Sequence, residues 1–278
     1  MHPGPVSEVG DTIACANQKG GVGKTTTVVN LAAELALRGR RVLVVDVDPQ
    51  GNATTGLGAD RSTTPSLYEA LCGTEAVDAL VIGTAVPGLS LIPSSRSLAG
   101  LEVELVSLDR RERRLSLALS HLREAYDHIL LDCPPSLGLL TVNALTAADA
   151  MLIPVQCEYY ALEAMSQLIG TIDLVRDHLN PHLGINGVVL TMFDARTRLA
   201  SDVSAEVRRH LGESVYETVI PRSVRLAEAP SYGAPAAIYA PQSVGAQAYR
   251  DLASEFLARD GRYRIHGQHQ ASSLGARA

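Results

Sequence analysis

Apolar runs of strand length alternate with longer stretches of helical periodicity along the chain from Asp11 onward. This alternation is typical of parallel β-α-β units, in which a helix connects consecutive strands of one sheet. Several of the runs are apolar at successive positions, as strands covered on both faces must be. We expect strands at residues 12–16, 41–46, 88–92, 128–132, 150–155, 186–191 and 215–220.

The segments between these runs carry apolar residues with a period near 3.6, which predicts helices. We expect helices at residues 24–38, 98–125, 137–147, 159–179, 198–211 and 243–259, the first of them ended by Gly39. No internal repeat and no linker rich in Pro, Gly or Ser divides the sequence. The pattern therefore predicts an α/β fold, a doubly wound and mostly parallel sheet flanked by helices, in a single domain at 11–260.

The ends of the chain do not continue this pattern. Residues 261–278 are polar and have no apolar stripe, so we expect a flexible C-terminal tail. Residues 1–10 are expected to form a flexible N-terminal extension. The arginine-rich run 110–114 has mixed charge inside a helical pattern and is predicted to form a solvated helix face.

Composition restricts the class of protein further. The chain has 278 residues, 46% of them hydrophobic, which is enough for a large core. It has neither 18 consecutive apolar residues nor a signal-like start, so we expect a cytoplasmic protein that does not associate with membranes. The four cysteines lack Cys-x-x-Cys spacing, which favours reduced, buried thiols over disulfides or a zinc site; they are Cys15, Cys72, Cys133 and Cys157.

The charged residues show one unusual feature. The net charge of -6 argues against a uniformly basic nucleic-acid binder, although it permits a local basic patch. Only two of the 24 basic residues are lysines, and Lys19 and Lys24 lie in the same glycine-rich loop. Codon usage can explain the excess of arginine but not these two exceptions. A compact, rotatable ammonium group is therefore predicted to be required at both positions.

This loop follows the first predicted strand and opens the first predicted helix. It consists of Lys19, Gly20, Gly21, Val22, Gly23, Lys24, Thr25 and Thr26. Glycines allow successive backbone N–H groups to point toward one anion, and the helix N-terminus adds positive charge. Lys24 is expected to reach the β and γ phosphates, Thr25 to ligate Mg²⁺, and Thr26 to contact the α phosphate. The commonest form of the motif has glycine where this chain has Gln18.

Acidic residues follow two other predicted strands. Asp46 and Asp48 come at and after the end of one strand, and Asp132 ends another. Because ligands of open α/β sheets bind at the carboxyl ends of the strands, these side chains should converge on the loop. Asp132 is expected to hold Mg²⁺ through a water molecule. Asp48 is predicted to position the attacking water and to contact the metal only indirectly, with Asp46 supporting it.

These motifs carry a family resemblance over nearly all of residues 11–258. KGGVGKTT, DVDPQGN and DCPPS, together with PVQCEYYALEA, TMFDARTRLA and PRSVRLAEAPSYG, resemble the ParA (Soj-type) chromosome-partitioning ATPases of the deviant Walker A branch of P-loop NTPases. The resemblance implies a slow, Mg²⁺-dependent ATPase that forms an ATP-bound sandwich dimer, in which Lys19 contacts phosphates bound by the partner subunit. It also implies that Pro221, Arg222 and Ser223 lie against the adenine, although family members often have Asn in place of Ser223.

The resemblance further implies two macromolecular partners. ParA-like dimers bind double-stranded DNA without sequence preference, through positions that correspond to Arg196 and Arg225. Residues 190–225 hold six arginines against five acidic residues, which is only a weak local excess that dimerisation would double. A ParB-type centromere-binding protein is expected to stimulate hydrolysis. The protein would then be associated with the nucleoid.

Two other classes share the loop. A MinD-like membrane-cycling ATPase requires a C-terminal amphipathic helix, and residues 261–278 have too few large apolar side chains for one. A reductase like the nitrogenase iron protein requires two interface cysteines to hold a cluster. Cys133 directly follows Asp132, and no cysteine lies between it and Cys72. Both alternatives are therefore disfavoured.

Overall fold

The computed structural model describes residues 10–158 and 161–259. The predicted extension, apart from Gly10, and the predicted tail lie outside the described residues, as do residues 159–160 at the start of one predicted helix and residue 260 at the end of the predicted domain. Gly10 itself is buried and donates a backbone hydrogen bond to the carbonyl of Arg123.

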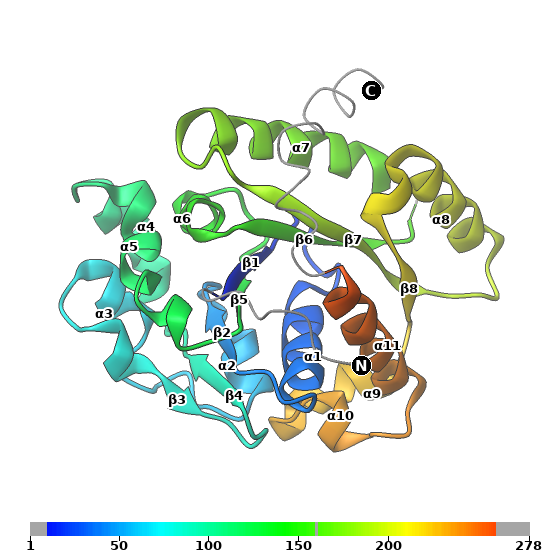
Figure 1. Cartoon of the computed structure of the whole chain (residues 1–278), viewed down its shortest axis with the longest axis horizontal. Helices are drawn as coiled ribbons and strands as arrows, with labels where there is room; N and C mark the ends of the chain where they lie inside the picture. Colours follow the sequence, from blue (N-terminus) through cyan, green and yellow to red (C-terminus); the bar gives the residue numbers. More distant parts are fainter. Residues whose placement is uncertain (1–9, 159–160, 260–278) are drawn as a thin grey trace.

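An eight-stranded sheet runs through the centre of the described structure (Figure 1). Its strands are β1 (Asp11–Cys15), β2 (Val42–Asp46), β3 (Ile82–Gly83), β4 (Leu89–Ile92), β5 (His128–Asp132), β6 (Ala150–Gln156), β7 (Gly184–Phe193) and β8 (Val215–Pro221). They are arranged in the order β3-β4-β2-β5-β1-β6-β7-β8. Every neighbouring pair is parallel except β3 and β4, which are antiparallel.

Helices cover both faces of this sheet. They are α1 (Lys24–Ala36), α2 (Asn52–Gly56), α3 (Leu67–Cys72), α4 (Leu98–Leu105), α5 (Arg114–Leu119), α6 (Leu139–Ala147), α7 (Ala161–His178), α8 (Arg198–Leu211), α9 (Val224–Glu228), α10 (Ala236–Tyr239) and α11 (Val244–Ala258). Single 3₁₀ turns are η1 (Val77–Leu80), η2 (Arg111–Arg113), η3 (Leu122–Glu124), η4 (Gly212–Ser214) and η5 (Ala229–Tyr232).

The two faces have separate apolar cores because successive side chains of a strand point in opposite directions. Ile13 and Cys15 of β1 pack with α1, α2 and α9–α11, whereas Ala14 packs with α3–α8. Figure 1 shows α1, α10 and α11 below the sheet and α6, α7 and α8 above it. The predicted doubly wound, mostly parallel architecture is thus confirmed.

All seven predicted strands are present, with ends that differ from the prediction by at most two residues. The eighth, β3, has only two residues and carries too short a pattern to predict. All four cysteines are free thiols, and Cys15, Cys133 and Cys157 are buried, as predicted. Within the described ranges, no helix is long and apolar enough to cross a membrane.

The predicted continuous helix at 98–125 is wrong. The segment is divided into α4, η2, α5 and η3, and Arg110 adopts the left-handed conformation with φ 50°. Asn143 of α6 explains part of the break, because it donates to the carbonyl of Arg111 and accepts from the N–H of Leu115. The arginine-rich run is therefore not a solvated helix face. Arg114 instead donates to carbonyls at the end of α3.

Candidate nucleotide site

The sheet brings the predicted site residues to one edge. In the parallel register, Cys15 at the end of β1 and Asp46 at the end of β2 both lie beside Asp132 at the end of β5. The glycine-rich loop leaves β1 at this point and enters α1. The loop and the acidic residues that follow β2 and β5 therefore converge, as the sequence predicts.

The loop has the backbone geometry of an anion cradle. Gly21 and Gly23 have φ values of 76° and 87°, in the left-handed region that favours glycine. Gly23 caps α1, and no side chain within the described structure supplies a capping hydrogen bond there. The first N–H groups of α1 consequently point out of the helix toward any anion bound by the loop.

Neighbouring strands hold the loop in place. Asn17 donates to the carbonyl of Pro154 at 2.7 Å and accepts from the N–H of Lys19 at 3.0 Å. Thr191 of β7 donates its hydroxyl hydrogen to the carbonyl of Val22 at 2.8 Å. The cradle is therefore fixed by β6 and β7 before any ligand binds.

Lys24 is almost fully buried, and its Nζ donates to the carbonyl of Lys19 across the loop at 3.3 Å. This contact holds the ammonium group against the backbone of the loop. A carbonyl is a weaker partner for an ammonium group than a phosphate oxygen would be. Lys24 is thus available to an anion held by the loop.

Asp132 is fully buried, and neither of its carboxylate oxygens has a hydrogen-bond partner among the described residues. Burial raises the pKa of Asp132 well above its ordinary value, and the charge of Asp46 raises it further. Thr25 and Lys24 lie close enough to favour the ionised form, but Thr25 does not meet the geometry of a hydrogen bond. An unpaired buried carboxylate beside a threonine hydroxyl fits a water-mediated magnesium site.

Asp46 and Asp48 are fixed differently. Asp46 accepts hydrogen bonds at 2.7 Å from both the N–H and the hydroxyl of Thr54. Burial nevertheless raises the pKa of Asp46 to about 7, although the bonds from Thr54 oppose this shift. Asp48 accepts from the N–H of Gln50 at 2.9 Å, and Ser94 donates to its carbonyl at 2.7 Å. The turn that carries Asp48 is therefore held rigidly next to Asp46.

A cavity of about 200 Å³ opens beside the cradle. Its lining is formed by Gly23, Thr26, Thr191, Met192, Ile220, Pro221, Arg222, Ser223, Leu226, Ala227 and Tyr249. The three residues predicted to contact adenine thus lie next to the loop, at the end of β8. The mainly apolar lining suits a planar base.

Met192, Leu226 and Tyr249 also line this cavity, and no sequence motif indicated them. Met192 has φ 51°, an uncommon conformation for a residue with a side chain. Met192 lies within the TMFDARTRLA segment, which carries part of the family resemblance, but that resemblance pointed to Arg196 and not to Met192. Tyr249 comes from α11, and its hydroxyl lies 3.1 Å from that of Thr27.

A second cavity of about 440 Å³ lies on the α2 side of the first turn of α1. It is lined by Thr25, Thr26, Val29, Asn52, Thr55, Gly56, Arg61 and Pro230. Thr26 therefore borders both cavities. Arg61 donates to the carbonyl of Pro49 at 3.3 Å, which ties this wall to the turn that carries Asp48.

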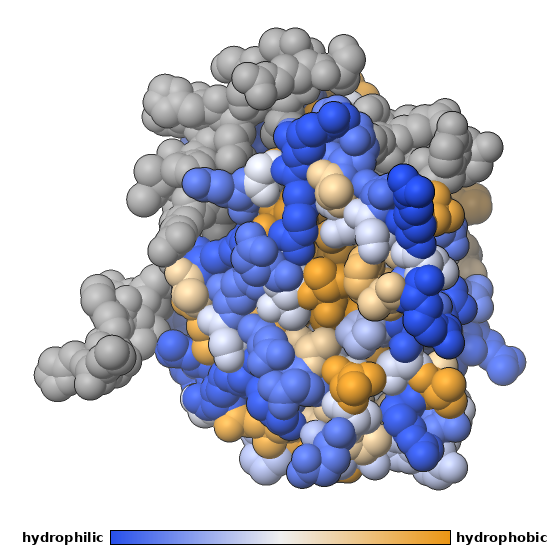
Figure 2. Space-filling view, turned by 90° about the vertical axis from the view of Figure 1, so that its right-hand side faces the viewer, coloured by the Kyte–Doolittle hydropathy of each residue, from blue (hydrophilic) through white to orange (hydrophobic). Residues whose placement is uncertain are grey.

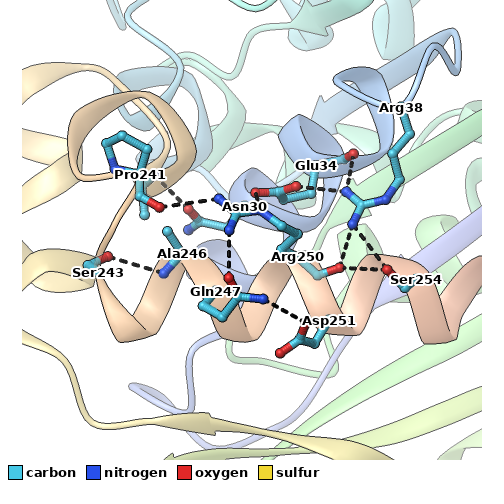
Figure 3. Close-up of polar contacts among 11 residues, drawn as sticks. Asn30, Glu34, Arg38, Pro241, Ser243, Ala246, Gln247, Arg250, Asp251 and Ser254 are labelled. Atoms are coloured by element: carbon cyan, nitrogen blue, oxygen red, sulfur yellow. Dashed lines mark hydrogen bonds and ion pairs between the residues drawn. The ribbon is translucent and has the colours of Figure 1, made fainter.

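Helix α1 is anchored from behind by polar contacts with α10 and α11, part of which Figure 3 shows. Asn30 donates to the carbonyl of Thr26 at 2.8 Å and accepts from the N–H of Ala236 at 2.7 Å. One turn further on, Arg38 pairs with the buried Glu34 at 2.7 Å and donates to the carbonyl of Arg250. Asn30 thus ties the first turn of α1 to the start of α10, and Arg38 ties the other end of α1 to α11.

The side chain of Lys19 is bound at the surface by Glu158, which follows β6. Its Nζ lies 2.5 Å from Oε2 of Glu158, and the two side chains are 41% and 46% exposed. The lysine predicted to cross a subunit interface is thus at the surface and carries an intramolecular partner.

The arginines predicted to contact DNA lie just beyond the carboxyl ends of two neighbouring strands. Arg196 follows β7 and Arg225 follows β8, and these neighbouring strands end with Phe193 beside Pro221. Arg196 pairs with Asp194 and Arg225 with Glu228, at 2.7 and 2.8 Å.

Comparison with known proteins gives a consistent result. A family model described as an AAA domain matches residues 10–185. The chain is 55% identical over 251 residues to the sporulation initiation inhibitor protein Soj of Bacillus subtilis, covering 90% of this chain and 99% of that protein. It is 52% identical over 253 residues to the chromosome partitioning protein ParA of Myxococcus xanthus, covering 91% and 89%.

A crystal structure of cobyrinic acid a,c-diamide synthase from Mycobacterium smegmatis, with bound ATP analog and magnesium, has the same fold. It superposes with a TM-score of 0.80 at 39% identity and covers 92% of this chain and 98% of that one.

Proposed function

Because the chain belongs to the Soj/ParA family of chromosome-partitioning ATPases, we propose that it is an ATP-dependent switch whose two states differ in subunit pairing and DNA binding. One structural observation carries the nucleotide part of this proposal. The open N-terminus of α1 faces a glycine loop beside a buried, unpaired carboxylate at Asp132. A phosphate with its cation satisfies both the free N–H groups and this carboxylate.

The cradle residues have distinct proposed roles. Gly20 to Gly23 and the first turn of α1 bind the phosphates through backbone N–H groups, and Lys24 neutralises the β and γ phosphates. Thr25 and, through water, Asp132 hold Mg²⁺, while Thr26 contacts the α phosphate. Bound Mg²⁺ supplies positive charge that stabilises the transferring phosphoryl group. The ATP analog and magnesium in the related Mycobacterium smegmatis structure support this assignment.

Asp48 is proposed to orient the water that attacks the γ phosphate. Its carboxylate is buried, and the turn that carries it is fixed by Gln50 and Ser94. A water molecule oriented by a rigid carboxylate reaches the reactive geometry at a low entropic cost. Asp46 supports Asp48 by accepting its N–H at 3.2 Å.

The cavity beside the cradle is proposed to receive the adenine. Pro221, Arg222 and Ser223 form its rim, and the apolar side chains of Met192 and Leu226 line it. The cavity and the cradle share Gly23 and Thr26, so a nucleotide can occupy both at once.

ATP-dependent dimerisation is proposed to exchange the partner of Lys19. In the isolated subunit the ammonium group is bound to Glu158, and in the dimer it would bind phosphate oxygens held by the other subunit. Because both groups of the present pair are half exposed, breaking it costs little. The partner's phosphates then make subunit pairing depend on the nucleotide.

The ATP-bound dimer is proposed to bind double-stranded DNA through Arg196 and Arg225, and to release it when a ParB-type partner stimulates hydrolysis. This places the protein at the nucleoid. We further propose that residues 11–260 act as one ATPase domain. The reductase alternative gains no support, because Cys133 is buried rather than displayed at a surface. The segment that a MinD-like anchor would need lies outside the described residues.

Co-sedimentation with DNA in the presence of ATP, ADP or no nucleotide, at two salt concentrations, tests this proposal. We expect retention only with ATP and much weaker retention at the higher salt concentration. Equal retention in all three nucleotide states would contradict the switch, and salt-independent retention would contradict phosphate contacts by arginine.

A further inference from the structure

The loops that follow β7 and β8 form one surface, which we call the arginine edge and define as residues 193–198 and 221–228. Besides the pairing of Phe193 with Pro221, the N–H of Arg222 donates to the carbonyl of Phe193 at 3.0 Å. Figure 2 views the molecule from the side on which α8, β8 and α11 lie in Figure 1, and its surface there is largely hydrophilic around a smaller apolar area. Both loops belong to this side.

Arg196 is bound by a carboxylate two residues earlier in the chain. Its Nε and Nη2 donate to the two oxygens of Asp194 at 2.9 and 2.7 Å, and its backbone N–H donates to the same side chain. These bonds lower the pKa of Asp194 to about 2, so the carboxylate stays ionised at neutral pH. The guanidinium fork is thus already occupied by a two-oxygen anion.

Arg225 is also bound by a carboxylate, although through a single oxygen. Its Nη1 donates to Oε2 of Glu228 at 2.8 Å, and the hydroxyl of Tyr239 donates to the same oxygen at 3.2 Å. The ring of Tyr239 stacks on that of Tyr232 with centroids 4.5 Å apart. Glu228 is therefore held toward Arg225 from α10 as well as from α9.

A carboxylate and a DNA phosphate offer a guanidinium group the same fork of two oxygens. A phosphate that uses the Nε–Nη2 fork of Arg196 must displace Asp194, and one that binds Arg225 must share its charge with Glu228. Arg222, which lies in sequence between them, is exposed, and no side-chain ion pair or hydrogen bond is found for it within the described ranges. Arg198, also within the edge, pairs with Asp202 of α8 at 3.6 Å. The edge of one subunit thus presents three arginines paired with carboxylates and the unpaired Arg222.

We propose that Asp194 and Glu228 act as built-in phosphate substitutes that mask Arg196 and Arg225, so that one subunit binds DNA too weakly to be retained and two joined edges are required. This inference rests on the proposed DNA-binding function and adds its regulation. Asp194 and Glu228 also keep the two guanidinium groups oriented, so they lower the affinity for DNA without disordering the surface.

Asp194→Asn and Glu228→Gln remove the masking charge and keep similar side-chain shapes. Because these ion pairs are exposed, we expect an affinity gain of about three-fold per site, and of about ten-fold in a dimer with two copies. The slope of log K against log salt should steepen by about 0.9 for each additional DNA phosphate that the protein neutralises. Glu228→Asp keeps the charge and should bind like the wild type.

The matched control is Glu112→Gln in η2, which breaks an ion pair with Arg111 far from the arginine edge. The affinity of each variant for a DNA duplex is measured by fluorescence anisotropy with ATP and with ADP, together with its ATP-dependent dimerisation and thermal melting. We expect the two edge variants to bind more tightly in both states, and to be retained with ADP when combined.

An affinity of Asp194→Asn and Glu228→Gln that does not exceed that of Glu112→Gln overturns the masking. An equal loss of binding in Glu228→Gln and Glu228→Asp also overturns it, because it shows a purely structural role. If the wild type itself does not bind DNA with ATP, the proposed function fails instead, so the two failures can be distinguished.

Discussion

Asp132 combines an electrostatic cost with a proposed function. Burial raises its pKa and that of Asp46, the latter to about 7. A carboxyl group whose pKa is higher in the folded state than in the unfolded state contributes its full stabilisation only below the unfolded-state pKa, which is about 4. This contribution is lost as the pH rises through the folded-state pKa. At neutral pH the two neighbouring buried carboxylates therefore destabilise the nucleotide-free protein, and a bound cation would offset this destabilisation.

Asp132→Asn is expected to stabilise the nucleotide-free protein at pH 8 and to flatten the loss of stability between about pH 4 and pH 8. The substitution removes a buried charge without breaking a hydrogen bond to any described residue. The melting temperature should rise by about 2–4 °C for each kcal/mol of repulsion removed. Thermal melting across this pH range measures the effect, and a lower melting temperature at pH 8 would contradict it.

Asp132→Asn should also weaken magnesium-dependent ATP binding. Calorimetry with and without Mg²⁺ distinguishes this effect from stability. Equal ATP affinity of variant and wild type in Mg²⁺ would reject the metal role.

Asp48→Ala is expected to bind ATP normally and to remain dimeric on DNA, while ATP turnover falls about 10²-fold or more. The substitution removes the carboxylate that orients water and leaves the cradle intact. Phosphate release together with size-exclusion chromatography measures both properties. Rapid turnover in this variant would exclude the assignment.

Lys19→Gln is expected to bind ATP within a few-fold of the wild type and to lose ATP-dependent dimerisation. Its ammonium group is bound to Glu158 at the surface of its own subunit, so the loss should appear only in pairing. Glu158→Gln is the matched control, because it breaks the same ion pair and keeps the lysine. Analytical ultracentrifugation with ATP compares the two, and normal dimerisation of Lys19→Gln would remove the cross-subunit role.

At the scale of elements, α1 links the cradle to the segment that carries the adenine rim. Asn30 joins its first turn to the start of α10 through two hydrogen bonds. Glu34 and Arg38 continue this polar seam toward α11 (Figure 3). A displacement of α1 would therefore be transmitted to the 222–240 segment.

Asn30→Ala is expected to destabilise the protein by about 1–3 kcal/mol, because it leaves the buried N–H of Ala236 without its partner. Nucleotide affinity should fall as well, since the cavity and cradle lose their common anchor. Ser254→Ala, at the exposed end of the same seam, should cost less than about 0.5 kcal/mol. Urea unfolding and nucleotide titration measure the two effects, and an equal cost of both substitutions would contradict the anchoring role.

The elements also show where sequence patterns are insufficient. The strands were predictable because two covering layers require nearly continuous apolar runs. The segment 98–125 has a helical period throughout, but Asn143 binds the backbone at Arg111 and Leu115 and divides it. Tertiary hydrogen bonds of this kind leave no local signal.

At the scale of the whole molecule, Arg225→Glu is expected to abolish DNA retention and to leave ATP-dependent dimerisation intact. The new carboxylate would lie beside Glu228 and repel phosphate. If a wild-type dimer neutralises about six phosphates, log K should fall against log salt with a slope near -5. DNA binding at several salt concentrations measures both, and full retention by the variant would exclude the arginine edge as the DNA surface.

The sequence by itself determined the sheet, the loop that follows β1, and the carboxylates after β2 and β5, because apolar periodicity and glycine spacing act locally. Parallel strands then necessarily bring their carboxyl ends to one edge. Only the tertiary structure decided which polar groups from distant parts of the chain meet. Lys19 pairs with Glu158, and Tyr239 of α10 donates to Glu228 of α9, because such contacts depend on the angles between packed elements, and a linear pattern does not encode those angles.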